Sequence, residues 1–323
     1  MNQKLTLIFL LLSCSLFGQQ LSQISNSGTF IKASNPSLVS EDFLLFENTV
    51  SVDVNYLAQW LGIEGNPTTQ QLNIQYLYET DGSFNLLFGA RLTNDETGPT
   101  GLISGGGSIA ALYAPEDPYY GGLSLGFSLG AVQYRVNTAE FNPRHANDFL
   151  TFENLKSTRP DIGIGFSYYK KDRDSWLNDG YWWAGISANQ ILSNDAAFDN
   201  IQGDLILNRV AHTTAFGGFQ KYFSKTALIQ PSVLVRFVPN APLNVDLNLR
   251  YFNNEAFWLG IGGSTSRSVF LEAGVVLGEN IGLEDKNIRL GYQFGYSLQN
   301  FGVNIGNIHQ FQLSYSLEAK QFN

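Results

Sequence analysis

Apolar and polar residues alternate with a period of two through most of this chain, and this alternation constrains its fold most. Residues 50–56 show the pattern clearly: the large apolar residues Val50, Val52, Val54 and Tyr56 alternate with the polar residues Ser51, Asp53 and Asn55. Successive side chains of a β-strand point to opposite faces, so the pattern predicts strands with one apolar and one polar face. Residues 311–317 repeat it near the C-terminus. The chain is therefore predicted to be all-β.

The alternation recurs in about fourteen segments, and an even number of strands is typical of bacterial β-barrels. The strongest segments are 50–56, 72–78, 84–92, 123–129, 162–168, 245–251, 288–296 and 311–317. Weaker segments lie at 102–113, 181–189, 209–219, 227–237, 256–264 and 268–277. No linker or change of composition separates them, so residues 50–323 are predicted to form one domain. The longer irregular stretches, 134–160 and 192–208, are predicted to be loops on the outside of the cell.

Two folds fit this pattern, a transmembrane antiparallel β-barrel of about 14 strands and a soluble β-sandwich. The composition favours the barrel, because only 15% of the residues are charged, against about 25% in soluble domains. A barrel also explains aromatic residues near strand ends, as in an interfacial belt. The residues expected in this belt are Trp60, Tyr119, Tyr120, Tyr169, Trp182 and Trp183. Polar residues such as Asp53, Arg91, Asp246 and Arg250 would then line a hydrated lumen.

Residues 1–18 are typical of a cleaved signal peptide, since Lys4 precedes an apolar run at 5–12 and small residues follow. The mature chain is then expected to begin near Gln19, with 19–49 as an N-terminal segment before the barrel. The only cysteine, Cys14, follows Leu11, Leu12 and Ser13 in an order that loosely resembles a lipobox. Acylation of Cys14 is therefore the alternative to cleavage near Gln19.

We expect the intact mass of the membrane-extracted protein to match a chain that begins near Gln19 and carries no lipid. A diacylated Cys14 at the mature N-terminus would contradict this assignment.

No group of residues with catalytic or metal-binding spacing is apparent. The histidines His145, His212 and His309 lie on separate segments, so neither a metal nor a cofactor is expected. His309 lies on the apolar phase of the last strand, which leaves an outer-membrane esterase as a rival hypothesis, although no Gly-x-Ser-x-Gly elbow accompanies it. The net charge of -9 excludes a basic footprint for nucleic acid. The chain is predicted not to be an enzyme.

An ordered set of short motifs resembles the PorP/SprF family of type IX secretion membrane proteins. The main one runs from Gln59 to Gln70, with the sequence QWLGIEGNPTTQ. Asn35-Pro36 precedes it, and Asn94-Asp95-x-x-Gly98-Pro99 follows it. The chain departs from the family at 37–40, where small Ala-Gly residues are usual, and at Gln310, where Glu follows the histidine. The residues singled out as structural or interaction positions are Asn35, Pro36, Gln59, Trp60, Gly62, Gly65, Pro67, Thr69, Gln70, Asn94, Asp95, Gly98 and Pro99.

The resemblance implies a protein of the bacterial outer membrane that has no enzymatic activity. It would aid the export or cell-surface anchoring of secreted adhesin or gliding proteins by binding their C-terminal domains. Its partners would be outer-membrane lipid, those domains and other components of the type IX secretion system. An outer-membrane channel or transporter for small hydrophobic solutes is the alternative function.

Overall fold

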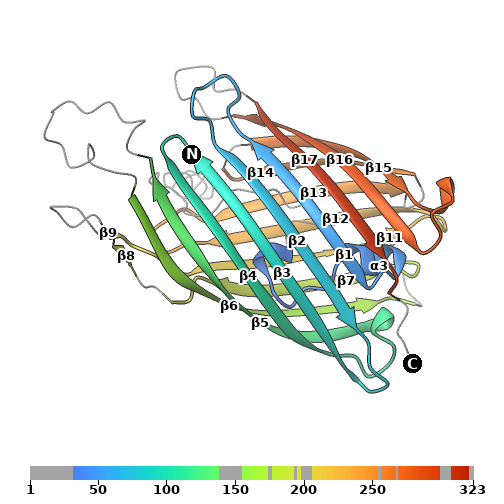
Figure 1. Ribbon diagram of the computed structural model, residues 1–323. Coiled ribbons are helices and arrows are strands. Elements are labelled where there is room, and N and C mark those ends of the chain that lie inside the picture. Colours follow the sequence, from blue (N-terminus) through green and yellow to red (C-terminus); the bar gives the residue numbers. More distant parts are fainter. Residues whose placement is uncertain are drawn as a thin grey trace, which may run out of the picture.

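The strands of this protein close into one antiparallel β-barrel (Figure 1). The computed structural model describes residues 32–137, 155–173, 177–192, 195–197, 206–253, 256–266, 268–298 and 307–319. In these ranges fourteen strands form the barrel, and β17 pairs back with β1. They are β1 (Val50–Ala58), β2 (Thr68–Tyr78), β3 (Phe84–Thr97), β4 (Thr100–Tyr113), β5 (Gly121–Val136), β6 (Leu155–Lys171), β7 (Tyr181–Asn189), β10 (His212–Phe219), β12 (Ala227–Phe237), β13 (Asn244–Asn253), β14 (Phe257–Ser264), β15 (Ser268–Leu277), β16 (Lys286–Ser297) and β17 (Ile308–Leu317). The predicted fold class and strand number are confirmed.

The elements outside the barrel wall are short. β8 (Ala196–Ala197) pairs with β9 (Ile206–Leu207), and β11 (Lys221–Tyr222) adds to one end of β12. The helices are α3 (Glu41–Phe46) and the 3-10 turns η1 (Pro118–Tyr120) and η4 (Glu279–Ile281). No helix in the described ranges is long and apolar enough to span a membrane.

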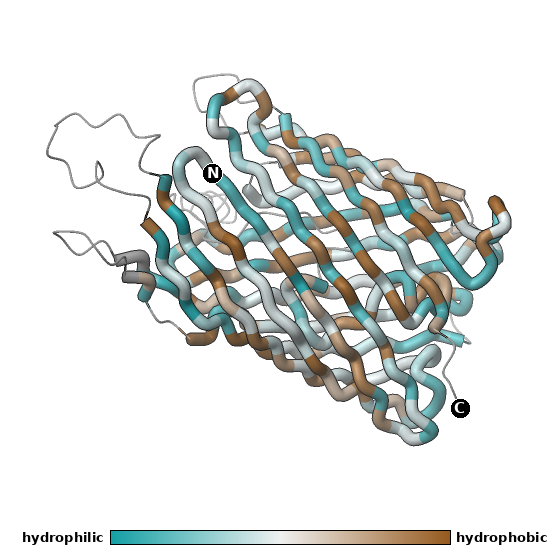
Figure 2. The backbone as a smooth tube through the Cα atoms, viewed as in Figure 1, coloured by the Kyte–Doolittle hydropathy of each residue, from teal (hydrophilic) through white to brown (hydrophobic). Residues whose placement is uncertain are grey.

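The two faces of the wall separate as the period-two pattern predicts. The outward side chains of Val54, Leu247 and Leu249 are 46%, 61% and 47% exposed, whereas Asp53 and Asp246 are 1% and 4% exposed. Figure 2 shows the apolar and polar residues alternating along each strand. The apolar side chains thus form the outer surface, and the polar ones point into the lumen.

Three of the aromatic residues predicted for an interfacial belt do not face outward. Trp182 is 41% exposed on the outer face, but Tyr169 and Trp183 are 1% and 9% exposed and pack in the lumen. Tyr119 packs against the same buried cluster. Neighbouring residues of a strand point to opposite faces, so only one member of the pair Trp182 and Trp183 can face the lipid. The belt prediction for Tyr119, Tyr169 and Trp183 is therefore wrong.

The boundaries predicted for the loop at 134–160 are also wrong. β5 continues to Val136 and β6 begins at Leu155, and these two residues are paired. Residues 138–154 lie outside the described residues. In the second predicted loop, 192–208, the described part contains the small β8–β9 sheet.

The two ends of the barrel differ in their connections. Val50 of β1 pairs with Leu317 of β17, so the first strand begins and the last strand ends at the same end. We call this the terminal end and the opposite one the loop end. The connections between β5 and β6 (137–154) and between β7 and β10 (190–211) belong to the loop end. They are the longest connections of the barrel.

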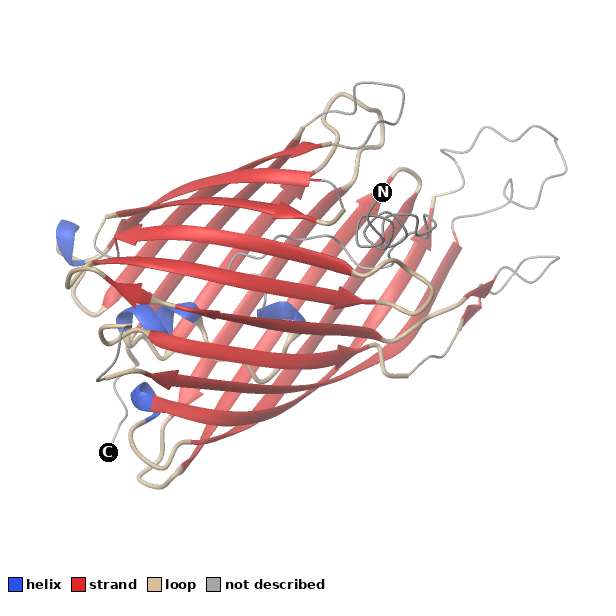
Figure 3. Cartoon of the chain, turned by 180° about the vertical axis from the view of Figure 1, so that it is seen from behind, coloured by secondary structure: helices blue, strands red, loops and turns tan. Residues whose placement is uncertain are grey.

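The segment before β1 turns back into the barrel, and we call its residues 32–46 the plug (Figure 3). Its helix α3 begins after Ser40, whose Oγ accepts a hydrogen bond from the Phe43 amide at 3.0 Å. The helix ends at Glu47, which has the left-handed φ of 60°. Ser is a favoured N-cap because its hydroxyl satisfies an amide of the first turn. The plug thus places a short, capped helix inside the barrel near its terminal end.

Candidate functional site

Two acidic residues of α3 bind arginines of the barrel wall. Glu41 Oε1 lies 2.6 Å from Arg250 Nη2 on β13, and Glu41 Oε2 lies 2.9 Å from Arg289 Nη1 on β16. Asp42 Oδ1 lies 2.9 Å from Arg289 Nη2. All four side chains are at most 5% exposed. Because a buried charge without a partner is strongly unfavourable, these pairs hold α3 at one position in the lumen.

The first described residue of the plug, Lys32, closes the same network from the opposite side. Its Nζ lies 2.8 Å from Asp53 Oδ2, 3.0 Å from Ser51 Oγ and 3.7 Å from Asp42 Oδ2. Ser51 and Asp53 belong to β1, so Lys32 joins the plug to the strand that the plug precedes. Both ends of the plug are therefore fixed by charge.

The charge state of Glu41 follows from its neighbours. Burial alone would raise the pKa of Glu41, but the positive charges of Arg250 and Arg289 outweigh it and lower the pKa from 4.5 to about 2. The stabilisation from this ionised carboxylate is complete above its ordinary pKa and is lost as the pH falls towards 2. Glu41 therefore binds the wall throughout the neutral range.

A second ion cluster lies on the β3 and β6 side of the lumen. Asp161 on β6 lies 3.0 Å from Arg91 Nη2 and 3.3 Å from Arg209 Nη2. Arg91 also donates a hydrogen bond to the carbonyl oxygen of Ala33 in the plug. Arg209, which is fully buried, donates to the carbonyl of Pro160 at 2.8 Å. This cluster joins the plug to the segment that enters β10.

Wall side chains also bind the main chain of the plug. The Ser34 carbonyl accepts hydrogen bonds from Ser187 Oγ at 2.7 Å and Asn189 Nδ2 at 2.6 Å. Ser167 Oγ donates to the Ser37 carbonyl at 2.8 Å, and Gln75 Nε2 donates to the Leu38 carbonyl at 2.7 Å. These donors bind main-chain carbonyls of the plug rather than particular side chains.

The predicted motif Asn35-Pro36 lies at the centre of these contacts. Asn35 Nδ2 donates to the carbonyls of Phe166 and Ile186 at 3.3 Å each, and its Oδ1 accepts from the Ser37 amide at 2.9 Å. Gly126 of β5 and Gly165 of β6 pair opposite each other directly beneath the motif. A Cβ on Gly126 would lie 2.8 Å from the Pro36 carbonyl carbon and oxygen. The two glycines thus make room for the motif.

We expect Gly126→Ala to weaken the seating of the plug by about 1–3 kcal/mol, because the added methyl meets backbone that is fixed on both sides. Proteolysis of the plug in outer-membrane vesicles measures the change. Gly82→Ala is the matched control, since its Cβ would meet nothing closer than 3.7 Å. Equal resistance to protease in both variants would show that the glycine does not position the plug.

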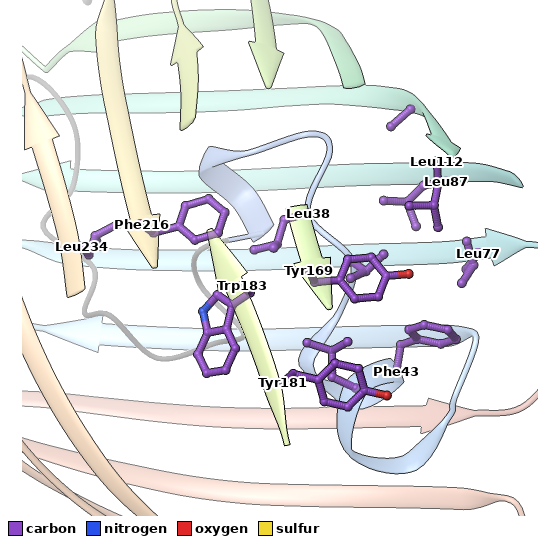
Figure 4. Close-up of a cluster of buried hydrophobic side chains, with 13 residues drawn as sticks. Leu38, Phe43, Leu77, Leu87, Leu112, Tyr169, Tyr181, Trp183, Phe216 and Leu234 are labelled. Carbon is purple, nitrogen blue, oxygen red and sulfur yellow. The ribbon is translucent and has the colours of Figure 1, made fainter. Parts of the chain in front are cut away.

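An apolar cluster packs beside α3 (Figure 4). Leu38 and Phe43 of the plug pack among inward side chains of the wall, and the Phe43 ring meets the Tyr119 ring edge-on with their centroids 6.4 Å apart. The wall residues of the cluster shown in the figure are Leu77, Leu87, Leu112, Tyr169, Tyr181, Trp183, Phe216 and Leu234. Charge and apolar packing together hold the plug against the wall near the terminal end.

The turn motifs predicted from the sequence come together at the loop end. The Gly98 amide donates to the Gly65 carbonyl at 2.8 Å, so the turn after β1 contacts the turn between β3 and β4. A Cβ on Gly65 would lie 2.9 Å from Gly98 Cα, and both residues have positive φ, 71° and 54°. Gln59 and Pro67 close the first turn through an amide-to-carbonyl hydrogen bond of 2.9 Å. Within this turn Gly62 and Trp60 have φ of 105° and 56°.

The remaining motif residues link the strands next to these turns. Thr69 Oγ1 donates to Asp95 Oδ1 at 3.3 Å, and Asn94 Oδ1 accepts from Arg135 Nη2 at 2.9 Å. Gln70 pairs across the strands with Asn94. The Pro99 carbonyl accepts from the Asn137 amide at 2.7 Å. The motif residues at 59–70 and 94–99 thus build one rim of the barrel, whereas Asn35 and Pro36 lie apart in the lumen.

The two histidines that the structure describes do not converge. His145 lies outside the described residues. His212 faces the lumen with Nδ1 3.0 Å from the Val210 carbonyl, whereas His309 faces outward with Nδ1 2.7 Å from Tyr292 Oη. Among the residues that the structure describes, no three His, Cys, Asp or Glu side chains are placed to hold a metal ion.

An apolar outer surface around a closed, polar lumen defines this protein as a β-barrel of the bacterial outer membrane. Its strands rather than helices carry the membrane-facing side chains. The chain belongs to the PorP/SprF family of type IX secretion system membrane proteins, whose sequence pattern matches residues 22–315. No curated protein matches the sequence.

The fold is similar to that of solved barrels of low sequence identity. CymD, a monoaromatic hydrocarbon channel, is 10% identical over 91% of this chain and 98% of its own, with a TM-score of 0.52. A Pseudomonas aeruginosa FadL homologue is 10% identical over 88% and 96%, with a TM-score of 0.48. The translocator domain of the autotransporter NalP from Neisseria meningitidis is 11% identical over 84% and 88%, with a TM-score of 0.45. The CymD likeness shows the fold alone.

Proposed function

We propose that this protein is a non-enzymatic outer-membrane component of type IX secretion. It aids the export or cell-surface anchoring of particular adhesin or gliding proteins by binding their C-terminal domains, and it contacts other components of the system. Membership of the PorP/SprF family supports the secretion role. The observation that supports the rest is the plug, because ion pairs and apolar contacts hold a segment of the chain itself inside the barrel, in the path that a solute would take.

The lumen also bears on the alternative, a channel for small hydrophobic solutes. CymD is a channel for monoaromatic hydrocarbons and has a similar fold. Here, however, the inward side chains beside the plug include charged and carboxamide groups, among them Asp53, Asn73 and Arg250, and the inward apolar cluster is already packed against Leu38 and Phe43 of the plug. Such a wall offers little to an apolar solute, because its polar groups would lose their partners. Planar-bilayer conductance and hydrocarbon uptake test the channel directly, and we expect neither in the intact protein.

The loop end is the surface proposed to bind the secreted proteins. Outer-membrane barrels carry longer loops outside the cell and shorter turns in the periplasm. The long connections 137–154 and 190–211 therefore support an orientation with the loop end outside the cell and the terminal end in the periplasm, near the other components of the system. A surface anchor would need its binding site on the outside.

We expect deletion of residues 139–154 to leave a folded, heat-modifiable barrel and to impair display of a cognate surface protein. The deletion stops before Leu155 and Lys156, because these residues belong to β6 and pair with β5. Removal of residues 279–282 from a turn at the terminal end is the control, and we expect it to preserve display. The readout is surface immunolabelling in the native host, with copurification of the client from outer membrane. Normal display after the loop deletion would exclude this loop from binding.

We expect the triple change of His145, His212 and His309 to glutamine to leave display intact. Of the two histidines that the structure describes, His212 contacts the Val210 carbonyl inside the barrel and His309 contacts Tyr292 on the outer face. The same immunolabelling measures display, and heat modifiability shows that the barrel is folded. Loss of display by a folded triple variant would reject the non-enzymatic function.

A further inference from the structure

The outer face of β5 and β6 carries two cations at the loop end. Arg135 of β5 and Lys156 of β6 pair directly opposite each other, and both side chains point outward. In the part of the chain that the structure describes, they are the two lysine or arginine side chains that point outward near the loop end. Like charges directly opposite each other on neighbouring strands are unfavourable. An anion close to this pair would therefore stabilise it.

The protein itself supplies only part of that negative charge. Glu96 of β3, Gly101 of β4, Arg135 and Lys156 lie in one row across the sheet. Because Gly101 has no side chain, Arg135 can reach across it, and Arg135 Nη2 lies 3.3 Å from Glu96 Oε1. These two side chains are 31% and 53% exposed, so their ion pair is weak. Within the described residues no carboxylate forms an ion pair with Lys156, and the row carries one negative and two positive charges.

The position of this row in the membrane follows from the aromatic side chains at the opposite boundary of the wall. The outward residue Leu123 of β5 pairs with Tyr113 on β4 and with Tyr168 on β6. The Tyr113 ring packs against the Phe84 ring of β3, with their centroids 5.1 Å apart. A girdle of outward aromatic residues is typical of the boundary between the hydrocarbon layer and the headgroups. Leu123 therefore lies at the boundary nearer the terminal end.

Arg135 lies twelve residues beyond Leu123 on the same strand. With a rise of about 3.3 Å per residue and a strand tilt of about 40°, the two residues are about 30 Å apart across the membrane. The apolar band of an outer-membrane barrel is about 25 Å tall, and Leu129 is the last large apolar residue on the outer face of β5. Arg135 and Lys156 therefore lie about 5 Å outside the hydrocarbon layer, at the level of the lipid headgroups.

The chemistry of the pair suits a phosphate group. The guanidinium of Arg135 offers N–H donors in a planar fork, and the ammonium of Lys156 adds a compact charge with three donors. Phosphate oxygens accept charge-assisted hydrogen bonds from both groups. The polar surface continues one row closer to the membrane, where Gln133 Nε2 donates to Thr158 Oγ1 at 3.1 Å. A phosphorylated headgroup that also carries hydroxyl groups would find hydrogen-bonding partners in both rows.

We propose that Arg135 and Lys156 bind a phosphate of a phosphorylated glycolipid of the lipid A type, in the outer leaflet of the membrane. The lipid supplies the anion that the two opposed cations lack, and it holds the side of the barrel that carries the connection 137–154. The choice of the outer leaflet rests on the proposed function, which orients the loop end outside the cell. The binding of a phosphate does not depend on that orientation.

The test compares the wild-type barrel with the double variant Arg135→Gln and Lys156→Gln by native mass spectrometry in detergent. The probes are lipid A with its phosphates, the same lipid without phosphate, and phosphatidylglycerol. We expect the affinity for lipid A to fall by about tenfold to thirtyfold in the double variant. The affinity for the lipid without phosphate should be low in both proteins and unchanged. Heat modifiability shows that both barrels are folded.

Glu96→Gln should change the affinity for lipid A in the opposite direction. Removal of this carboxylate frees Arg135 for the phosphate, so lipid A should bind about twofold to fivefold more tightly. A purely structural ion pair would not give this increase. Lys286→Gln is the matched control, because Lys286 points outward at the opposite end of the barrel, where it pairs with Leu317. We expect this variant to bind lipid A as the wild type does.

Equal affinity of the wild type and the double variant for lipid A overturns the proposal, and so does equal affinity of the wild type for the lipid with and without phosphate. Tighter binding of phosphatidylglycerol than of lipid A overturns both the proposal and the orientation on which it rests. Copurification of the secreted client is measured separately. A barrel that binds lipid A as expected but retains no client supports the lipid site and overturns the proposed function.

Discussion

Replacement of Arg289 by methionine should destabilise the barrel by about 3–5 kcal/mol and release the plug. Arg289 binds both Glu41 and Asp42, so its loss leaves two buried carboxylates short of a partner. Among the described residues, Asp42 would keep only Lys32 as a cationic partner, with Lys32 Nζ 3.7 Å from Asp42 Oδ2. The measurements are heat modifiability of the extracted barrel, protease access to residues 32–46 and conductance in a planar bilayer. The expected variant unfolds at a lower temperature, is cleaved in the plug and conducts ions.

The control for this variant is Arg173→Ala. Arg173 lies 2.6 Å from Glu116 on the surface, where the two side chains are 47% and 67% exposed. Exposed pairs contribute about 0–1 kcal/mol, so this change should leave stability and plug protection nearly unaltered. If Arg289→Met behaved like this control, the ion pairs around α3 would not be what holds the plug.

Replacement of Val54 by arginine should destabilise the barrel by about 2–4 kcal/mol. Val54 lies in the middle of β1 and is 46% exposed on the apolar outer face, so the arginine would lie in the hydrocarbon layer. Urea titration of the barrel folded in lipid vesicles measures the loss. An aspartate in place of Ser108 should be tolerated much better, because that side chain faces the lumen and lines a cavity there together with the cations Lys32 and Arg91. Equal losses at the two positions would mean that the outer face is not in contact with lipid.

The positions of the strands could be predicted from the sequence because the period-two pattern is a local property. Each of the fourteen predicted segments coincides with a strand of the barrel wall, although segment 209–219 begins three residues before β10 and segment 256–264 one residue before β14. The ends of the long strands could not be predicted so well. On β5 the outward residues beyond Leu129 include Gln133 and Arg135, and on β6 they include Lys156 and Thr158. Outside the hydrocarbon layer an outward side chain need not be apolar, so the alternation ends while the hydrogen-bonded ladder continues.

The candidate site was predicted only in part. Asn35 and Pro36 were singled out, but the ion pairs of Glu41, Asp42 and Arg289 were not. The plug has neither a regular period nor a long helix, and its partners lie far away along the chain, on β13 and β16. The one local signal was the presence of charged residues, such as Asp53 and Arg250, on the polar face of strands. Their partners became evident only when the barrel was closed.

The same separation along the chain orders the assembly of the protein. Glu41 precedes the first strand of the barrel in the sequence, whereas its two arginine partners lie on β13 and β16, near the end of the barrel sequence. A partly inserted sheet that lacks β16 offers α3 no Arg289, and the seam between β1 and β17 is still open at that stage. The plug can therefore reach its final position only after the last strands have inserted. Its ion pairs form when the barrel closes.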